Sequence, residues 1–255
     1  MLYSLAMSVY IDGKSWNGPI PYVFAVDVAN REWAETWIEH FNRRGAKEIF
    51  IPREKASAGL AADYVVFVET GVKLGESTHG ESPIGRQGGE QKVMFHKSNS
   101  PAPAQYTILH EMGHCVGLGH EQYNPKWIFR YSLSEIHSSN YEKQISLYRV
   151  FQNGECDYAS IMMYSLAAFG ITEERLRKKI TPAPTPVLSA SKLEETRAER
   201  FLREQAERDA VEAERKRHRR QFEQESKRYF TIPSDLSSGD VALIQHLYPN
   251  VKSLS

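Results

Sequence analysis

The chain has 255 residues, 41% of them hydrophobic, and its 32 basic and 32 acidic side chains leave a formal net charge of zero. That length supports one full-sized domain, or one domain with an appendage. Without a global basic or acidic excess, we expect no nucleic-acid partner and no acidic tail. Only two cysteines, Cys115 and Cys156, are present, which excludes a disulfide framework. No apolar run approaches the roughly 20 residues that cross a bilayer, so no membrane span is expected.

The amino-terminal stretch MLYSLAMSVYIDGK has neither a basic region nor a small-residue cleavage site, so it is not a recognisable signal peptide. Together with the low cysteine count, this leaves two expected locations. The protein is either intracellular or exported without a cleavable signal.

The first hundred residues alternate between short apolar runs and one helical pattern, which is typical of a mostly parallel sheet with a helix on one face. In the helical pattern, Trp33, Trp37 and Phe41 recur every four residues, and Gly45 stands where the helix would end. The glycine-rich residues 71–90 are predicted to be irregular. The expected elements are strands at 21–26, 48–52, 63–69 and 91–95, and a helix within 29–45.

Besides the charged stretch described below, two further helices are expected in the rest of the chain. The first spans about 104–116 and ends at Gly117. The second is a short amphipathic helix in LSSGDVALIQHLYP (236–249), which Ser238 or Asp240 could cap.

An almost wholly charged stretch, residues 192–228, follows a Pro-containing linker at 181–191. Its Glu-before-base pairs at i,i+4, each worth about 0.2–0.5 kcal/mol, predict a long helix. Its apolar positions are too sparse for a coiled coil. Two interpretations stay open: a solvated projecting helix, or a docking arm for a protein partner or for a nucleic-acid or membrane surface through RKRHRR (215–220).

The stretch TILHEMGHCVGLGHEQ (107–122) holds the candidate functional residues. His110 and His114 are four apart and share one helix face, so their imidazoles can chelate one cation. Glu111 lies between them and can reach a water held by that ion, where a general base is needed. Gly117 lets the chain turn back, so that His120 can supply a third nitrogen.

Three neutral imidazoles with an open fourth position suit a catalytic zinc ion, whereas structural zinc sites are closed by four protein ligands. Such an ion lowers the pKa of its bound water and polarises a carbonyl oxygen. The alternative is three ordinary histidines in a core or on a surface. The fixed spacing of Glu111, Gly117 and His120 favours the metal site.

The segment HEMGHCVGLGH (110–120) fits the H-E-x-x-H-x-x-G-x-x-H pattern of metzincin zinc peptidases, and SIMMY (160–164) supplies the Met-turn that they need. Within the metzincins the chain most resembles the astacin family, over about residues 14–170 and 231–250. Glu121 directly follows the third histidine, as in that family. Four other stretches are similar to astacin segments: WNGPIPYVF (16–24), SPIGRQGGEQKVMF (82–95), DYASIMMY (157–164) and LSSGDVALIQHLYP (236–249).

The resemblance implies a role for each matching residue. The three histidines would bind one catalytic Zn²⁺. Glu111 would act as the general base on the zinc-bound water and later deliver a proton to the leaving amine. Met162 would form an apolar floor beneath the metal without ligating it. Tyr164 would bind zinc at rest and then hydrogen-bond the oxyanion of the tetrahedral intermediate.

The chain departs from the family in several places. Met163 stands where the family usually has histidine, and the segment after Gln122 is not Arg/Asp-rich. The paired cysteines of secreted members are missing, so we expect Cys115 and Cys156 to be free, partly buried thiols. Mature members bury their amino terminus near the glutamate after the third histidine. Glu121 is therefore expected either to meet a trimmed terminus or to hydrogen-bond locally.

The implied fold is α+β: a metzincin-type zinc peptidase of two subdomains, with a twisted mixed sheet and helices above the cleft and an irregular or helical lower part after about residue 117. The long charged helix would be an insertion. The expected layout is a short amino-terminal extension (1–13), a catalytic domain (14–180), the linker and charged insertion (181–230) and a C-terminal helix that completes the catalytic domain (231–255).

The resemblance implies an endopeptidase whose substrate is an extended polypeptide that pairs with an edge strand. The alternative is a catalytically silent zinc-binding module that works through the 192–228 helix. The presence of both Glu111 and Tyr164 favours the peptidase.

Overall fold

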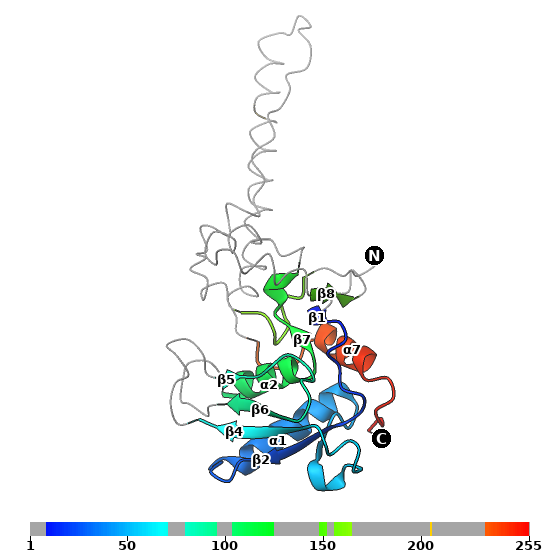
Figure 1. The fold of residues 1–255 in the computed structure, drawn as a ribbon. Coiled ribbons are helices and arrows are strands. Elements are labelled where there is room, and N and C mark those ends of the chain that lie inside the picture. Colours follow the sequence, from blue (N-terminus) through cyan, green and yellow to red (C-terminus); the bar gives the residue numbers. More distant parts are fainter. Residues whose placement is uncertain are drawn as a thin grey trace, which may run out of the picture. The chain divides into compact units, whose positions relative to one another are not determined.

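The computed structural model describes residues 9–70, 80–95, 104–124, 148–151, 156–164, 205 and 233–254 (Figure 1). Contacts divide the chain into two units: Met1–Tyr164 with Ile232–Ser255, and Ser165–Thr231. Apart from Gln205, the second unit lies outside the described residues. The linker and the charged helix predicted at 192–228, with its docking role, therefore stay predictions.

The larger sheet has five strands in the order β3-β2-β4-β6-β5. The first four run parallel to their neighbours, and β5 pairs antiparallel with β6 at the edge. The prediction of a mostly parallel sheet is confirmed, and with the helices it makes the fold α+β. Sequence analysis missed β5, because a Gly-Glu dipeptide carries no apolar alternation. The strands are β2 (Ile20–Phe24), β3 (Phe50–Pro52), β4 (Tyr64–Glu69), β5 (Gly80–Glu81) and β6 (Glu90–Phe95).

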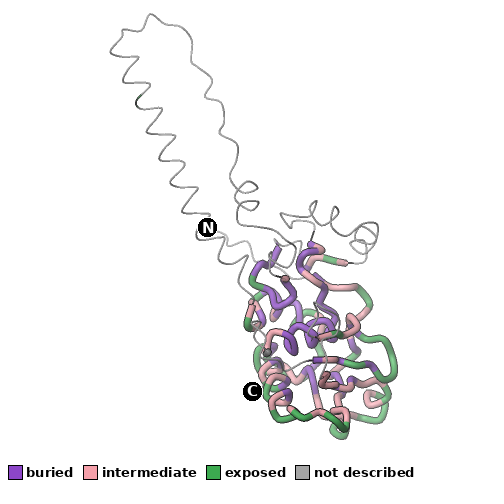
Figure 2. Tube along the Cα trace, turned by 90° about the vertical axis from the view of Figure 1, so that its left-hand side faces the viewer, coloured by how far each residue is buried: buried purple, intermediate pink, exposed green. Residues whose placement is uncertain are grey.

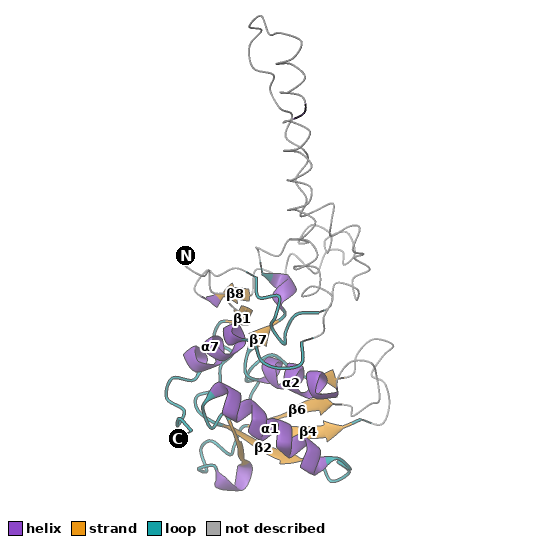
Figure 3. Cartoon of the chain, turned by 180° about the vertical axis from the view of Figure 1, so that it is seen from behind, coloured by secondary structure: helices purple, strands orange, loops and turns teal. Residues whose placement is uncertain are grey.

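Two helices, α1 (Arg31–Gly45) and α2 (Ala104–Cys115), cover the same face of this sheet (Figure 3). The ring of Trp33 in α1 lies 5.9 Å from that of Phe95 in β6. Phe95 pairs with Gly80, whose missing side chain would point at α2. Because paired residues point to the same side of a sheet, both helices pack on that side. α1 ends at Gly45 as predicted, although the left-handed residue that closes it is Ala46, with φ 53°.

A second, three-stranded antiparallel sheet has the order β7-β1-β8. Its strands are β1 (Val9–Ile11), β7 (Leu118–Gly119) and β8 (Tyr148–Val150). Residues 9–11, which the sequence analysis placed in an amino-terminal extension, form the central strand. The part after about residue 117 was predicted to be irregular or helical, and strands β7 and β8 correct that expectation. The strands are too short to show a period-2 pattern.

One continuous hydrophobic core joins the two sheets to helices α1, α2 and α7 (Ser238–Leu247). Figure 2 shows the buried residues in the interior of the described part. Helix α7 packs on this core through Leu243 and Ile244, which are both fully buried. Among the described helices, none is long and apolar enough to span a lipid bilayer.

The N-cap of α7 is Ser237 and neither Ser238 nor Asp240, the two residues predicted, although Asp240 takes part in the cap. Ser237 Oγ accepts a hydrogen bond from the Asp240 N–H at 3.0 Å, and Asp240 Oδ2 accepts one from the Ser237 N–H at 3.0 Å. This reciprocal pair is a capping box. Ser237 Oγ also donates to Asp157 Oδ2 at 2.6 Å, which ties the start of α7 to the 156–164 segment.

Replacing Ser237 with alanine should lower the free energy of unfolding by about 1–2 kcal/mol, because it removes the cap together with the hydrogen bond to Asp157. Urea unfolding measures the change. The matched control is Ser238→Ala, one residue along and exposed, which should change stability by less than about 0.5 kcal/mol. Equal losses in the two variants would contradict the assigned cap.

Candidate metal centre

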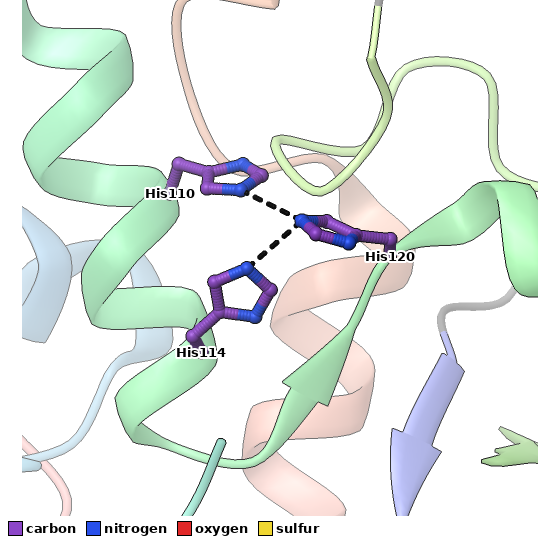
Figure 4. A group of neighbouring side chains, drawn as sticks. All are labelled: His110, His114 and His120. Carbon is purple, nitrogen blue, oxygen red and sulfur yellow. Dashed lines mark hydrogen bonds between the residues drawn. The ribbon is translucent and has the colours of Figure 1, made fainter. Parts of the chain in front are cut away.

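The three predicted histidines converge from two directions (Figure 4). His110 and His114 project from one face of α2. The chain then turns at Gly117, whose φ of 105° favours glycine. It runs through β7 and presents His120 opposite the helix. Their ligand nitrogens all lie within 4.8 Å of one another.

The spacing of the Nε2 atoms fits a single small cation. His120 Nε2 lies 3.1 Å from His110 Nε2 and 2.9 Å from His114 Nε2. Nitrogens bound to one zinc ion at about 2.1 Å in tetrahedral geometry lie about 3.4 Å apart. Small side-chain movements would therefore suffice for coordination.

The outer nitrogens of the two helical histidines are held by backbone carbonyl groups. His110 Nδ1 lies 2.8 Å from Ile161 O, and His114 Nδ1 lies 3.0 Å from Leu118 O. A carbonyl oxygen only accepts, so each Nδ1 carries the proton and each Nε2 keeps a lone pair for a metal. In known metal sites, a hydrogen bond from the ring nitrogen that does not bind the metal orients the histidine in this way.

Burial keeps the imidazoles neutral, which is the form that binds metal. It lowers the pKa of His110 to about 4 and that of His114 to about 3, and it holds the pKa of His120 well below its ordinary value. Within the described residues, no fourth His, Cys, Asp or Glu joins the cluster. Three neutral nitrogens with an open position are the donor set of a catalytic zinc site, so these residues fit zinc.

Glu111 belongs to α2, and its side chain faces the edge strand β5. A Cβ atom at Gly80 would be 2.7 Å from Glu111 Cγ and 2.8 Å from Thr107 Cγ2. Only a residue without a side chain allows this approach of the strand. Burial, and secondarily the nearby Glu81 carboxylate, raises the pKa of Glu111 to about 8. A carboxyl group with a pKa near neutrality is suited to exchanging protons.

The predicted Met-turn lies against the helix that carries the histidines. Met162 is fully buried, and its sulfur contacts the position where Gly113 lacks a side chain. The ring centroid of Tyr164 lies 4.5 Å from that of His120 and 5.5 Å from that of His110. Burial, followed by the Glu111 charge, raises the pKa of Tyr164 to about 12, so its phenol remains a hydrogen-bond donor. The structure thus brings Tyr164 to the histidine cluster.

Asp240 of α7 fixes the Met-turn from behind. Its Oδ1 accepts a hydrogen bond from Ser160 Oγ at 2.6 Å, and its Oδ2 accepts one from the Ile161 N–H at 2.9 Å. Ser160 Oγ in turn accepts from the Met162 N–H at 2.9 Å. Ile161 also supplies the carbonyl that orients His110. Asp240 therefore acts on a candidate metal ligand through one intervening residue.

Glu121 is fully buried, and its partners are distant in sequence. Its Oε1 accepts from the Val9 N–H at 2.7 Å, and its Oε2 accepts from the Asp157 N–H at 3.0 Å. The expectation of local hydrogen bonding was wrong. The amide of Val9 inside β1 occupies the place expected for a trimmed amino terminus.

Cys115 and Cys156 are free thiols, as predicted, and both are buried where partial burial was expected. Burial raises the pKa of both, so they remain protonated. Their sulfur atoms therefore supply neither a disulfide nor a reactive thiolate.

Sequence analysis missed three residues of this region: Gly80, Tyr106 and Asp240. Tyr106 stands four residues before His110, so its place on the histidine face of α2 was readable from the spacing. Gly80 stands in a glycine-rich stretch without periodicity. Asp240 was read only as a helix cap, because no local pattern shows a contact with the Met-turn.

The amino-acid sequence was compared with models of known protein families. The model of the astacin peptidase family matches residues 9–183. Nematocyst expressed protein 6 of Nematostella vectensis is 30% identical over 156 residues, which are 58% of this chain and 50% of that protein. The chain therefore spans about half the length of this curated relative.

Two solved structures are similar to the chain at low identity. The first is high choriolytic enzyme 1, a hatching-enzyme zinc protease from the medaka Oryzias latipes, with a TM-score of 0.48 and 19% identity over 96% of this chain and 99% of that one. The second is myroilysin, with a TM-score of 0.46 and 14% identity over 96% of this chain and 100% of that one. The family match rests on sequence and is independent of both.

Replacing His114 with alanine should reduce bound zinc from one ion per chain to nearly none, because only two nitrogens would remain at the centre. Elemental analysis of protein loaded with zinc and then desalted measures this directly. The control is His40→Ala, whose side chain contacts Asp235 outside the cluster, and it should keep the full zinc content. Full retention of zinc by the His114 variant would exclude the site.

Proposed function

This chain belongs to the astacin family of peptidases, and we propose that it is a zinc-dependent endopeptidase that hydrolyses peptide bonds of polypeptide substrates. The observation that carries the proposal is a cluster of three imidazoles, two buried on helix α2 and one half-buried opposite it, beside a buried glutamate on the same helix. A site that only stored zinc would not need that glutamate beside it.

In this proposal His110, His114 and His120 hold the zinc ion. A zinc ion bound by three imidazoles acidifies a water molecule and polarises a carbonyl oxygen. The carbonyls of Ile161 and Leu118 keep the Nδ1 protons in place, so that His110 and His114 present their Nε2 lone pairs.

Glu111 is assigned the proton transfers. Its carboxylate takes a proton from the attacking water and later gives one to the departing amine. The contact with Gly80 restricts where this carboxylate can lie. Tyr164, whose phenol stays protonated at neutral pH, donates a hydrogen bond to the oxyanion that forms at the scissile carbonyl.

The edge strand β5 is the proposed docking line for substrate. It is the last strand of the sheet order, and it pairs with β6 on one side. Its backbone passes beside Glu111, so an extended peptide added on the side where β5 pairs with no other described strand would lie along the metal centre. Backbone hydrogen bonds would then give affinity without demanding one side-chain sequence.

Glu111→Gln should lower the cleavage rate of unfolded casein at least about a hundredfold, because the amide cannot accept the proton. A zinc chelator should abolish cleavage by the unaltered protein, and added zinc should restore it. Cleavage is followed by release of acid-soluble peptides. Undiminished cleavage by Glu111→Gln would sink the proposed mechanism. Tight zinc binding without cleavage in any condition would favour the silent zinc-binding module.

Gly80→Ala should lower kcat about ten- to a hundredfold, because the new methyl group displaces the Glu111 side chain. Zinc content should not change, since the atoms nearest that methyl position belong to Glu111 and Thr107 and not to a histidine. The matched control is Gly59→Ala, because a Cβ atom at Gly59 meets nothing within 4 Å. Steady-state cleavage of a quenched fluorescent peptide compares the two, and equal kcat values would contradict the role given to the edge strand.

A further inference from the structure

Tyr106 lies one turn before His110 on α2 and faces the same way. Its ring centroid is 5.3 Å from that of His110, with 37° between the ring planes. The side chain is partly buried and packs against the hydrophobic core. Partial burial of this kind is typical of a residue that lines a binding site, because such a residue packs on the core on one side and stays accessible on the other.

The Tyr106 ring lies beside His110, close enough to the catalytic groups for their charges to act on its phenol. After burial, the charges that raise the pKa of its phenol are those of Tyr164 and Glu111. The phenol therefore stays neutral at physiological pH and offers one O–H donor. Tyr164 approaches the histidine cluster from the Met-turn, whereas Tyr106 approaches it from the helix.

Within the described residues, no side chain or backbone group forms a hydrogen bond with the Tyr106 hydroxyl. Other buried or structural phenols do have such partners: the hydroxyl of Tyr248 donates to Val116 O at 3.0 Å, and that of Tyr64 donates to Glu90 Oε2 at 2.6 Å. The Tyr106 hydroxyl is not among the buried polar atoms that lack a partner in the described residues, so it remains accessible. An accessible, unpaired donor beside a reaction centre is suited to a ligand that brings the acceptor.

We propose that the Tyr106 hydroxyl binds the substrate, by donating a hydrogen bond to a backbone carbonyl oxygen of the polypeptide at the metal centre. This inference rests on the proposed peptidase function and adds a binding residue to it. A backbone carbonyl is the acceptor because every extended peptide presents one at regular intervals, whatever its side chains. The contact forms with bound substrate and persists in the transition state, so it contributes to KM rather than to kcat.

Tyr106→Phe removes the hydroxyl and leaves the ring that packs on His110. With a quenched fluorescent peptide taken from casein, we expect KM to rise roughly three- to tenfold, which is the effect of one hydrogen bond, while kcat changes less than about twofold. Zinc content should stay the same. The matched control is Tyr64→Phe, which removes an exposed phenol hydroxyl from β4 and should leave KM unchanged.

A binding measurement separates this inference from the proposed function. In the Glu111→Gln background, the anisotropy of the fluorescein-labelled casein peptide reports affinity without turnover, and adding Tyr106→Phe should weaken binding by the same factor. If the unaltered protein cleaves the peptide and the Tyr106 variant shows the same KM and the same binding affinity, the inference is overturned. The proposed peptidase function is unaffected by that result. Absence of both cleavage and binding would overturn both. A fall in kcat alone would also overturn it, because the hydroxyl would then act only in the transition state.

Discussion

Two buried carboxylates, Glu121 and Asp240, hold together the segments that shape the metal centre. Both side chains are fully buried, and a buried polar group without hydrogen-bond partners costs about 1–3 kcal/mol. Their hydrogen bonds therefore have to form when the chain folds. Glu121 joins the amino-terminal strand to Asp157, and Asp240 joins the last helix to Ser160 and Ile161.

The effect reaches the histidines through the backbone. Because Asp240 fixes the amide of Ile161, the carbonyl of the same residue is fixed where it accepts the Nδ1 proton of His110. The far side of α2 is constrained by the edge strand, whose Gly80 lies against Glu111. The candidate ligand His110 and the proposed base Glu111 thus sit on one helix, and each is positioned by a different part of the chain. Sites built on regular elements keep their geometry better than sites built on loops.

Features with a local period could be predicted from the sequence, and features set by distant pairing could not. The spacing of His110, His114 and His120, the stripe on α1 and the apolar strands of the larger sheet follow from helical and strand periodicity. The sheet around β1 depends on residues 9, 118 and 150 meeting in space, and each of its strands is too short to show a pattern. The cap was misassigned because two serines stand side by side, and Ser237 is distinguished by its capping box with Asp240 and its contact with Asp157.

The hydrogen bond between Ser160 and Asp240 spans the point where the unit Ser165–Thr231 interrupts the first unit. Further contacts close the same junction: Asp157 accepts from Ser237, and Asp235 is held by His40 and Arg44 of α1. These contacts lie within the first unit itself. The entropic cost of bringing the two ends of an interposed segment together grows only slowly with its length, by about 0.6 kcal/mol per doubling. A longer or shorter segment in place of residues 165–231 would therefore cost the first unit little stability, and the candidate metal centre would keep its geometry.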